Sequence, residues 1–364
     1  MRAKTVLALG LMSGTSLDGI DAALVETDGE AVAATGAAIT VPYDPALRER
    51  LRCILGSRGP SAEVAAVEAA LTDAHADAVR ALLRAAGVAP ERVAVAGFHG
   101  HTILHDPAGR RTWQIGDAAR LAAATGIDIV HDFRTADVAA GGEGAPLAPA
   151  FHAALARMLP GPLAVLNLGG VGNLTWISGA APLLAFDTGP GNALIDDWVK
   201  RCTGAICDMD GRLAARGRVQ ESILSMLLGH PYFERIPPKS LDRDAFDPSP
   251  VHALPVEDGA ATLAAFTAAA VERAVAHLPA PPLRWLVTGG GRHNPTLLAM
   301  LRTRLGVAVE PVEAVGWDGD ALEAQAFAFL AVRSLRGLPL SYPGTTGVPQ
   351  PQPGGRLTRR AAAA

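Results

Sequence analysis

An aspartate beside a glycine-rich turn is the strongest candidate for catalysis in the sequence. Asp187 ends an apolar segment and opens the run Asp-Thr-Gly-Pro-Gly-Asn at residues 187–192. A carboxylate placed there can project into a cleft and accept a proton from a hydroxyl or a water. The alternative is that Asp187 caps a helix beginning near Asn192. Thr188 or Asn192 could fill that cap, which would leave Asp187 available for chemistry.

A glycine-bearing turn near the N-terminus is the first candidate for phosphate binding. Residues 14–19 read Gly-Thr-Ser-Leu-Asp-Gly between two expected strands. Glycines let the backbone approach a phosphate, and successive N–H groups and the hydroxyls of Thr15 and Ser16 can donate to its oxygens. Asp18 could hold a hydrated Mg²⁺ that bridges phosphate oxygens. Taken alone, the segment could equally be an ordinary hairpin turn.

Two further glycine turns extend this pattern. Residues 169–173 read Gly-Gly-Val-Gly-Asn, and residues 289–294 read Gly-Gly-Gly-Arg-His-Asn. Two hairpin turns could hold a polyphosphate from both sides, and the third turn, between a strand and a helix, could take a nucleoside at the helix N-terminus. Each could be structural by itself, but together they favour a nucleotide site. The P-loop, the Rossmann fingerprint, the nucleophile elbow and the zincin motif are all absent.

Other polar residues allow more than one interpretation. His99 and His101 have no cysteine or carboxylate at metal-ligand spacing, so substrate hydrogen bonding is the better hypothesis for both. Glu323 enters an otherwise apolar helix near its start, where it could serve the helix dipole or a function equally well. Residues 208–211 (Asp-Met-Asp-Gly) lack the bidentate glutamate of a calcium loop and are predicted to form a turn.

The elements that position these residues follow two repeated patterns. Strands are expected at residues 5–12 and 20–26, and again at 163–168 and 174–177, each pair joined by a glycine turn. This repetition predicts two α/β lobes built on one plan. Further strands are expected at residues 93–98, 127–130 and 284–288, and helices at 62–86, from about 117, from 150, from about 295 and at 320–333.

The lobes and the tail can be given approximate limits. The first lobe is predicted to comprise residues 1–135 and about 335–348, and the second residues 136–334. The long glycine-rich loop at residues 137–149 is expected to be functional, because loops of this length inside a domain usually are. Residues 349–364, rich in Pro, Gly, Arg and Ala, are predicted to be disordered.

Composition excludes several classes of protein. The 364 residues suffice for two domains, and a formal net charge of −4 gives no basic excess for nucleic-acid binding. No segment has the roughly 18 uninterrupted apolar residues of a membrane helix. The start is predicted to be a β-strand and not a signal peptide. Three cysteines without a dense pattern predict a reducing, cytoplasmic compartment, with structural roles for Cys53, Cys202 and Cys207.

A series of ordered motifs resembles one known family. The chain is similar to the anhydro-N-acetylmuramic acid kinases, bacterial enzymes of cell-wall recycling in the actin, sugar kinase and Hsp70 superfamily. The resemblance runs from about Leu7 to Gly347. It rests on the segments at residues 10–19, 99–102, 114–116, 132–134, 137–146, 167–170, 186–192, 208–211, 238–240 and 288–291. It implies a two-lobed, ribonuclease H-like ATPase fold with the active site in the interlobe cleft.

The resemblance also implies a reaction and its residues. Water would open 1,6-anhydro-N-acetylmuramic acid, and ATP would phosphorylate O6 with Mg²⁺, to give N-acetylmuramic acid 6-phosphate. Asp187 would be the general base, and a homodimer is expected. ATP would be bound by Gly14, Thr15, Ser16, Leu17, Asp18, Gly19, Ile20, Asp21, Gly169, Gly170, Asn173, Gly289, Gly290, Gly291 and Asn294. The sugar would be bound by His99, His101, Gln114, Arg134, Asp137 and Glu323.

Three alternatives share parts of this pattern. A kinase of the same fold could act on an open hexose without adding water. An actin-like or Hsp70-like ATPase would share the ATP turns, but no peptide-binding domain fits after the last of them. A phosphatase on this fold would not explain the motifs around His99, Gln114 and Arg134. One departure from the family concerns residues 241–244, which read Leu-Asp-Arg-Asp where Thr-Gly-Arg-Glu is more common, so the role of the loop at 238–240 stays open.

Overall fold

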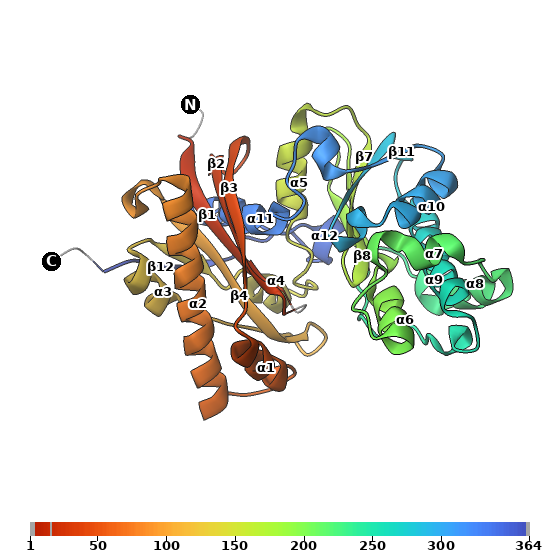
Figure 1. The fold of residues 1–364 in the computed structure, drawn as a ribbon. Helices are drawn as coiled ribbons and strands as arrows, with labels where there is room; N and C mark the ends of the chain where they lie inside the picture. Colours follow the sequence, from red (N-terminus) through yellow and green to blue (C-terminus); the bar gives the residue numbers. More distant parts are fainter. Residues whose placement is uncertain (1–3, 15–16, 362–364) are drawn as a thin grey trace. The chain divides into compact units, whose positions relative to one another are not determined.

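The chain folds into two compact units. The computed structural model describes residues 4–14 and 17–361 (Figure 1). Unit 1 comprises Met1–Arg157 and Asp320–Ala364, and unit 2 comprises Met158–Gly319. The predicted limits near residues 135 and 335 were therefore wrong. Helices α5 (Pro149–Leu155) and α11 (Leu322–Leu335) pack on one another in unit 1, so the chain changes unit only beyond them.

The sheet of unit 1 is mixed. In order across the sheet, its strands are β3 (Val32–Pro42), β2 (Gly19–Thr27), β1 (Val6–Ser13), β4 (Val95–Asp106), β6 (Ile129–His131) and β12 (Arg356–Thr358), and β5 (Arg111–Ile115) pairs with β4. Strand β2 runs antiparallel to β1 and β3, whereas β4 is parallel to β1 and β6 is parallel to β4. The first predicted hairpin is thereby confirmed.

The sheet of unit 2 repeats this plan. Its order is β9 (Leu184–Pro190), β8 (Val171–Ile177), β7 (Leu163–Leu168), β10 (Arg284–Thr288) and β11 (Ala308–Pro311). Only β8 runs antiparallel to its neighbours, as β2 does in unit 1. If the additional strands β5 and β12 of unit 1 are left aside, each unit has the strand order third–second–first–fourth–fifth of the ribonuclease H-like fold. The predicted duplication and fold class are confirmed.

Helices cover both faces of the sheet in unit 1. They are α1 (Pro45–Ile54), α2 (Ala62–Ala86), α3 (Ala118–Thr125), α4 (Thr135–Ala139), α5, α11 and α12 (Pro343–Thr346). Helix α2 starts after Ser61, whose hydroxyl accepts from Val64 N–H, and ends at left-handed Gly87. Its buried face shares a core with Leu9 and Leu11 of β1. Figure 1 shows α2 and α11 on opposite sides of β1 and β4.

Two glycines let α11 lie unusually close to its sheet. A Cβ on Gly10 of β1 would overlap the carbonyl oxygen of Ala324, and one on Gly97 of β4 would overlap that of Phe327. Both glycines therefore face the backbone of α11 at a distance that only a residue without a side chain allows. This packing fixes the start of α11, where Glu323 lies, against the strand that leads into the first glycine turn.

Unit 2 is organised around one buried helix. Its helices are α6 (Ala193–Thr203), α7 (Arg212–Arg216), α8 (Glu221–Leu228), α9 (Val256–Ala274) and α10 (Pro295–Leu305). Every residue of α9 from Gly259 to Val271 is buried, and α6, α7, α8, α10 and β9 all contact this helix. In the part of the chain that the structure describes, no helix is both long and apolar enough to cross a membrane.

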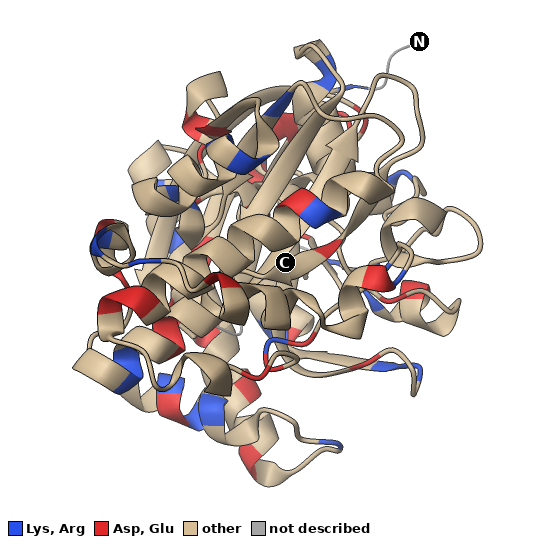
Figure 2. Ribbon diagram, turned by 90° about the vertical axis from the view of Figure 1, so that its right-hand side faces the viewer, with Lys and Arg blue, Asp and Glu red and all other residues tan. Residues whose placement is uncertain are grey.

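Acidic and basic residues are interspersed along the ribbon in Figure 2, without a large region of one sign. Many form exposed ion pairs, such as Arg120 with Asp73 and Arg243 with Asp197. Pairs of this kind contribute little to stability, typically below about 1 kcal/mol each. These surface charges therefore serve the solubility of the protein more than the stability of its fold.

The C-terminal segment has a defined place in unit 1, and its predicted disorder was wrong for residues 349–361. Strand β12 pairs antiparallel with β6, and Gln352 exchanges backbone hydrogen bonds with Ser341. The N–H of Arg360 donates to Asp128 at 3.0 Å. These contacts use the backbone at a free strand edge, so a segment without a hydrophobic pattern can still be held.

Candidate active site

Asp187 is held at both carboxylate oxygens. It lies on β9, where Oδ1 accepts a hydrogen bond from Asn173 Nδ2 on β8 and Oδ2 accepts one from the N–H of Leu241, each at 2.8 Å. The residue is only partly buried. Helix α6 begins after Asn192, so Asp187 sits inside a strand and not at the helix cap. A fixed and accessible carboxylate is what a general base requires.

The backbone of Asp187 is held from a second direction. Its N–H donates to the carbonyl of Lys239 at 3.0 Å, and its carbonyl accepts from the hydroxyl of Tyr232 at 2.5 Å. These two residues and Leu241 were not identified from the sequence. The only available signal was the family segment at residues 238–240, whose role had stayed open.

Hydrogen bonds connect the second glycine turn to the residues just before α6. Asn192 Nδ2 donates to the carbonyls of Leu168 and Gly169 at 2.7 and 3.2 Å. The N–H of Gly191 donates to the carbonyl of Gly170 at 3.0 Å. Asn192 therefore anchors the turn and does not cap the helix, which shows no side-chain cap. Asn173 of the same hairpin donates a hydrogen bond to Asp187. The second glycine turn, a candidate for phosphate binding, and the candidate base are therefore held by the same hairpin.

The third glycine turn packs directly on the second. Gly289 has φ 74°, and a Cβ there would overlap Oδ1 of Asn167. A Cβ on Gly291 would overlap the side chain of Leu168. Glycine is required at both positions, because the backbone of one turn touches the strand end that leads into the other. Two nucleotide candidates more than a hundred residues apart in sequence are thus neighbours in unit 2.

A cavity of about 460 Å³ opens beside these turns. Gly290 and Asn294, both predicted to bind ATP, line it, and Asn294 also caps α10 by accepting from the N–H of Leu297 at 2.9 Å. Its other lining residues were not among the predicted ATP contacts; they are Asn192, Ile195, Asp196, Cys207, Asp208, Met209, Asp210 and His293. The volume lies within the range of small-molecule sites.

Acidic groups line part of this cavity. Burial raises the pKa of Asp196 to about 6, and the neighbouring charge of Asp197 adds to the effect. Asp208 accepts from the N–H groups of Leu213 and Ala214 at 2.8 and 2.9 Å and so stabilises the start of α7. The predicted turn at residues 208–211 is confirmed, and it forms one wall of the cavity as well.

The first glycine turn is described in part. Thr15 and Ser16 lie outside the described residues. Leu17 has φ 59°, a strained conformation for a branched side chain, and its N–H donates to the carbonyl of Gly14 at 3.1 Å. The side chain of Leu17 is buried in the core of unit 1, which holds the turn in this conformation. Asp18 is exposed at the turn, with Oδ1 accepting from the N–H of Gly19 at 2.9 Å.

Strand β2 continues from this turn. Ile20 is buried in the core of unit 1, and Asp21 accepts a hydrogen bond from the hydroxyl of Thr40 on β3 at 2.6 Å. A Cβ on Gly19 would crowd the carbonyl oxygen of Val41, so β2 and β3 approach closely here. Contacts of Ile20 and Asp21 with ATP stay predictions.

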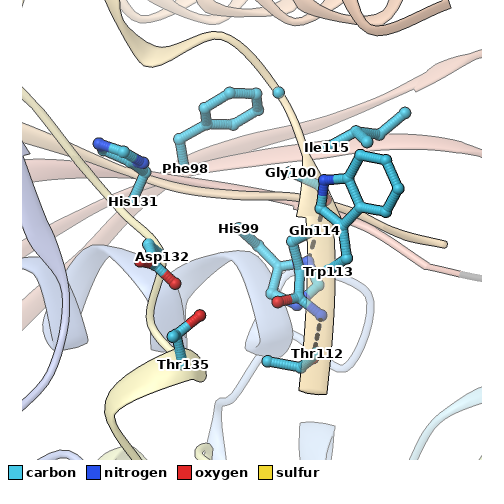
Figure 3. Close-up of a pocket in the computed structure, with 11 residues that line it drawn as sticks. Phe98, His99, Gly100, Thr112, Trp113, Gln114, Ile115, His131, Asp132 and Thr135 are labelled. Carbon is cyan, nitrogen blue, oxygen red and sulfur yellow. Dashed lines mark hydrogen bonds between the residues drawn. The ribbon is translucent and has the colours of Figure 1, made fainter. Parts of the chain in front are cut away.

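Two residues of the predicted sugar site line a smaller cavity in unit 1. Its volume is about 230 Å³, and His99 and Gln114 line it. Figure 3 shows His131, Asp132 and Thr135 on one side of it and Thr112, Trp113 and Gln114 of β5 on the other. Gln114 Nε2 donates to the hydroxyls of Thr102 and Thr112 at 3.1 and 2.8 Å.

His99, which lines this cavity and is buried, is hydrogen-bonded to the partly buried Arg134. Arg134 Nε donates to His99 Nε2 at 3.1 Å, and Arg134 Nη1 donates to the carbonyl of Gly144 at 2.7 Å. His99 must then carry its proton on Nδ1, which donates to the carbonyl of Gly100 at 3.0 Å. Burial lowers the pKa of His99, and it lowers that of Arg134 to about 10 against the opposing charges of Glu323 and Asp137.

Asp137 and His101 have structural contacts that the sequence did not predict. Asp137 is buried and accepts from the N–H of Gly144 and the hydroxyl of Thr346, each at 2.6 Å, and from the hydroxyl of Ser341. His101 is buried on β4, and its Nδ1 lies 2.8 Å from the hydroxyl oxygen of Ser13, next to the first glycine turn. Sugar contacts of these two residues stay predictions.

Three buried histidines of unit 1 predict a loss of stability in acid. Burial lowers the pKa of His75, His101 and His152 to about 4. In the unfolded chain these rings take up protons near pH 6.5, so between pH 6.5 and 4 the unfolded state binds more protons. Their contribution to stability is complete above pH 6.5 and falls as the pH drops toward 4. The expected loss is about 2 kcal/mol per histidine between pH 7 and pH 5.

Urea unfolding followed by circular dichroism at pH 7, 6 and 5 measures this loss. The His75→Gln variant lacks one of these titrating rings, so its unfolding free energy should fall less steeply than that of the wild type. Equal slopes for the two proteins would contradict the assignment of His75 to the acid sensitivity.

The candidate site lies within a region of the chain that matches a known protein family. The sequence model of the anhydro-N-acetylmuramic acid kinases matches residues 6–359. This chain belongs to that family. The matched range includes Asp187, the three glycine turns and both cavities, so the family assignment covers every part of the candidate site.

The sequence aligns with individual members of this family over nearly their whole lengths. An anhydro-N-acetylmuramic acid kinase from Paramagnetospirillum magneticum is 61% identical over 96% of this chain and 99% of its own. Those from Rhodospirillum rubrum and Acidiphilium cryptum are 60% and 57% identical, over 96% and 98% of this chain and 93% and 99% of their own lengths. The recognition of an anhydro-N-acetylmuramic acid kinase from its motifs is therefore confirmed.

Proposed function

We propose that this chain opens 1,6-anhydro-N-acetylmuramic acid with water and phosphorylates its O6 from ATP, in the recycling of cell-wall sugars. The products are N-acetylmuramic acid 6-phosphate and ADP. The observation that carries the proposal is the partly exposed Asp187, held at both oxygens and paired on β9 with Asn173, which follows a glycine turn suited to phosphate. Membership in the kinase family supplies the substrate class.

The proposed reaction needs one base. Asp187 accepts a proton from a water, and the water oxygen attacks the anomeric carbon of the sugar. The bond between that carbon and O6 breaks, and O6 attacks the γ-phosphorus as the bond to the β-phosphate oxygen breaks. ADP leaves, and the proton on Asp187 returns to solvent. Asn173 and the N–H of Leu241 keep the carboxylate oriented during this sequence.

Nucleotide binding is proposed for the glycine turns of both units. The nucleoside lies in the cavity beside Gly290 and Asn294, and the backbone N–H groups of Gly169 and Gly170 face the phosphates. Phosphate contacts of the turn at residues 14–19 in unit 1 stay predictions. Among the described residues no cluster of three or more potential ligands forms a metal cage. An exposed Asp18 fits Mg²⁺, which takes one or two carboxylates and completes its shell with waters and phosphate oxygens. The bound ion would neutralise phosphate charge.

Sugar binding is proposed for unit 1. His99 and Gln114 line its smaller cavity, and Arg134 contacts His99 behind it. The carboxylate of N-acetylmuramic acid would pair with a cation, and Arg134, a partly buried guanidinium that donates to His99, is the group proposed for this contact. Glu323, whose charge acts on Arg134, would accept from a sugar hydroxyl.

Isotope labelling tests the proposed reaction. Purified protein, ATP, Mg²⁺ and the anhydro-sugar are incubated in ¹⁸O-labelled water, and the product is analysed by mass spectrometry. One phosphoryl group plus one labelled oxygen at the anomeric carbon is the expected result. Glucose under the same conditions is the control for the alternative of an open-hexose kinase. Phosphorylated glucose with no product from the anhydro-sugar would replace the present proposal by that alternative.

A homodimer and a cytoplasmic location are proposed from the family resemblance. In agreement with a reducing compartment, Cys53, Cys202 and Cys207 are free thiols in the structure.

A further inference from the structure

We propose that Lys239 is a positioning residue for the reaction, and that its ammonium group holds Asp187 in place through Tyr232 and through the segment at residues 238–241. The inference rests on the proposed role of Asp187 as the base. It assigns a role to a loop that departs from the more common family sequence immediately after Ser240.

The segment around Lys239 contacts Asp187 twice. The N–H of Asp187 donates to the carbonyl of Lys239 at 3.0 Å, and the N–H of Leu241 donates to Asp187 Oδ2 at 2.8 Å. One bond fixes the backbone of Asp187, and the other fixes its carboxylate. Because both partners belong to one three-residue stretch, a displacement of this stretch would move the carboxylate itself.

The side chain of Lys239 anchors this stretch in the interior of unit 2. Lys239 is 5% exposed, and its Nζ lies 3.3 Å from the carbonyl oxygen of Tyr232, 3.5 Å from that of Phe233 and 3.4 Å from His277 Nε2. Among the described residues, no carboxylate is seen within ion-pair distance of Nζ, although the charge of Glu234 attracts it from farther away. A buried cation without an anionic partner is costly, and burial lowers the pKa of Lys239 to about 8.

Two aromatic rings face the ammonium with the electron-rich side of their π-systems, and both adjoin Asp187. Nζ of Lys239 lies 4.7 Å from the ring centroid of Tyr232 and 5.8 Å from that of Phe186. Tyr232 donates its hydroxyl to the carbonyl of Asp187 at 2.5 Å, and Phe186 precedes Asp187 on β9. Cation–π attraction therefore links the ammonium to Tyr232, which holds the carbonyl of Asp187, and to Phe186, the residue before Asp187.

The residue type agrees with this geometry. The sequence has three lysines, at positions 4, 200 and 239, and 29 arginines. A compact ammonium can donate to two backbone carbonyls while it faces two rings, whereas a planar guanidinium has a fixed fork of donors. Lys239 is thus a buried lysine in a chain whose cations are mostly arginines.

The test is a double-mutant cycle on kcat. Lys239→Met removes the charge but keeps the stem, and Tyr232→Phe removes only the hydroxyl that holds Asp187. Each is expected to lower kcat on the order of tenfold and to leave the KM for ATP within about twofold, because a misplaced base affects the chemical step. If Lys239 acts through Tyr232, the double variant loses little more than Lys239→Met alone. Losses that multiply would overturn the inference.

Controls separate positioning from folding and from the proposed function. Lys200→Met makes the same replacement at an exposed position of α6 and should keep kcat within about twofold. Calorimetric ADP binding shows that each variant is folded, and Tyr232→Phe remains informative if Lys239→Met is not. Asp187→Asn is assayed alongside. If it keeps activity, the base assignment fails. If it is inactive while folded Lys239→Met has wild-type kcat, the positioning inference alone fails.

Discussion

Replacing Asp187 by asparagine is expected to lower kcat by about 10³-fold or more, because an amide cannot accept the proton that the reaction must release. The amide keeps the shape of the carboxylate. Its oxygen can still accept from the N–H of Leu241, and the side-chain amide of Asn173 can turn to present its own oxygen. The site should therefore keep its geometry, and nucleotide affinity should change by less than about threefold.

A coupled assay of ADP release and calorimetric ATP binding measure the two quantities. Asp197→Asn is the matched control, since Asp197 is an exposed carboxylate of the same unit that pairs with Arg243. This control should retain nearly full activity. Activity of Asp187→Asn within tenfold of the wild type would exclude Asp187 as the base and redirect the search to other carboxylates of the candidate site.

Replacing Asp137 by alanine is expected to destabilise unit 1 by about 4 kcal/mol. The buried carboxylate accepts from the N–H of Gly144 and from the hydroxyls of Ser341 and Thr346. Alanine would leave these donors without an acceptor in the interior, and the cost of an unsatisfied buried group exceeds that of a lost surface bond. The loop that carries Gly144 should loosen and release Arg134, which donates to the carbonyl of Gly144.

Differential scanning calorimetry measures this effect as a fall in the melting temperature of about 10 °C. Asp77→Ala, at an exposed carboxylate paired with Arg80 on α2, is the control and should change the melting temperature by no more than about 2 °C. An unchanged melting temperature in Asp137→Ala would show that its hydrogen bonds do not organise the loop. If catalysis alone is then lost, the predicted sugar contact of Asp137 becomes the better explanation.

Much of the local structure could be predicted from the sequence. The strands around the two glycine turns, the helix at residues 62–86 and the start of α10 at Pro295 appear as expected. Such elements follow from short-range features, namely runs of apolar residues, the cap at Ser61 and left-handed glycines such as Gly87. The repetition of strand, glycine turn and strand likewise predicted two units with one plan. Asp187 was singled out because it ends an apolar segment beside a glycine-rich turn.

Contacts between distant segments could not be predicted from local sequence patterns. Leu241 lies 54 residues from Asp187, and no periodicity links the two. The same holds for Gly97 against α11 and for β12 against β6. Composition even predicted disorder for the residues of β12, because backbone pairing at a free strand edge leaves no hydrophobic pattern.

The sequence by itself thus determined the secondary structure around the glycine turns, the duplicated α/β plan and the candidate base, since each depends on neighbours in the chain. Only the tertiary structure decided which groups surround that base. Hydrogen-bond partners such as Tyr232 and Leu241, and the buried cation of Lys239, reach Asp187 because the sheet of unit 2 and the helices packed on it bring separate segments to the same strand. These contacts depend on topology and packing, which local residue patterns do not specify.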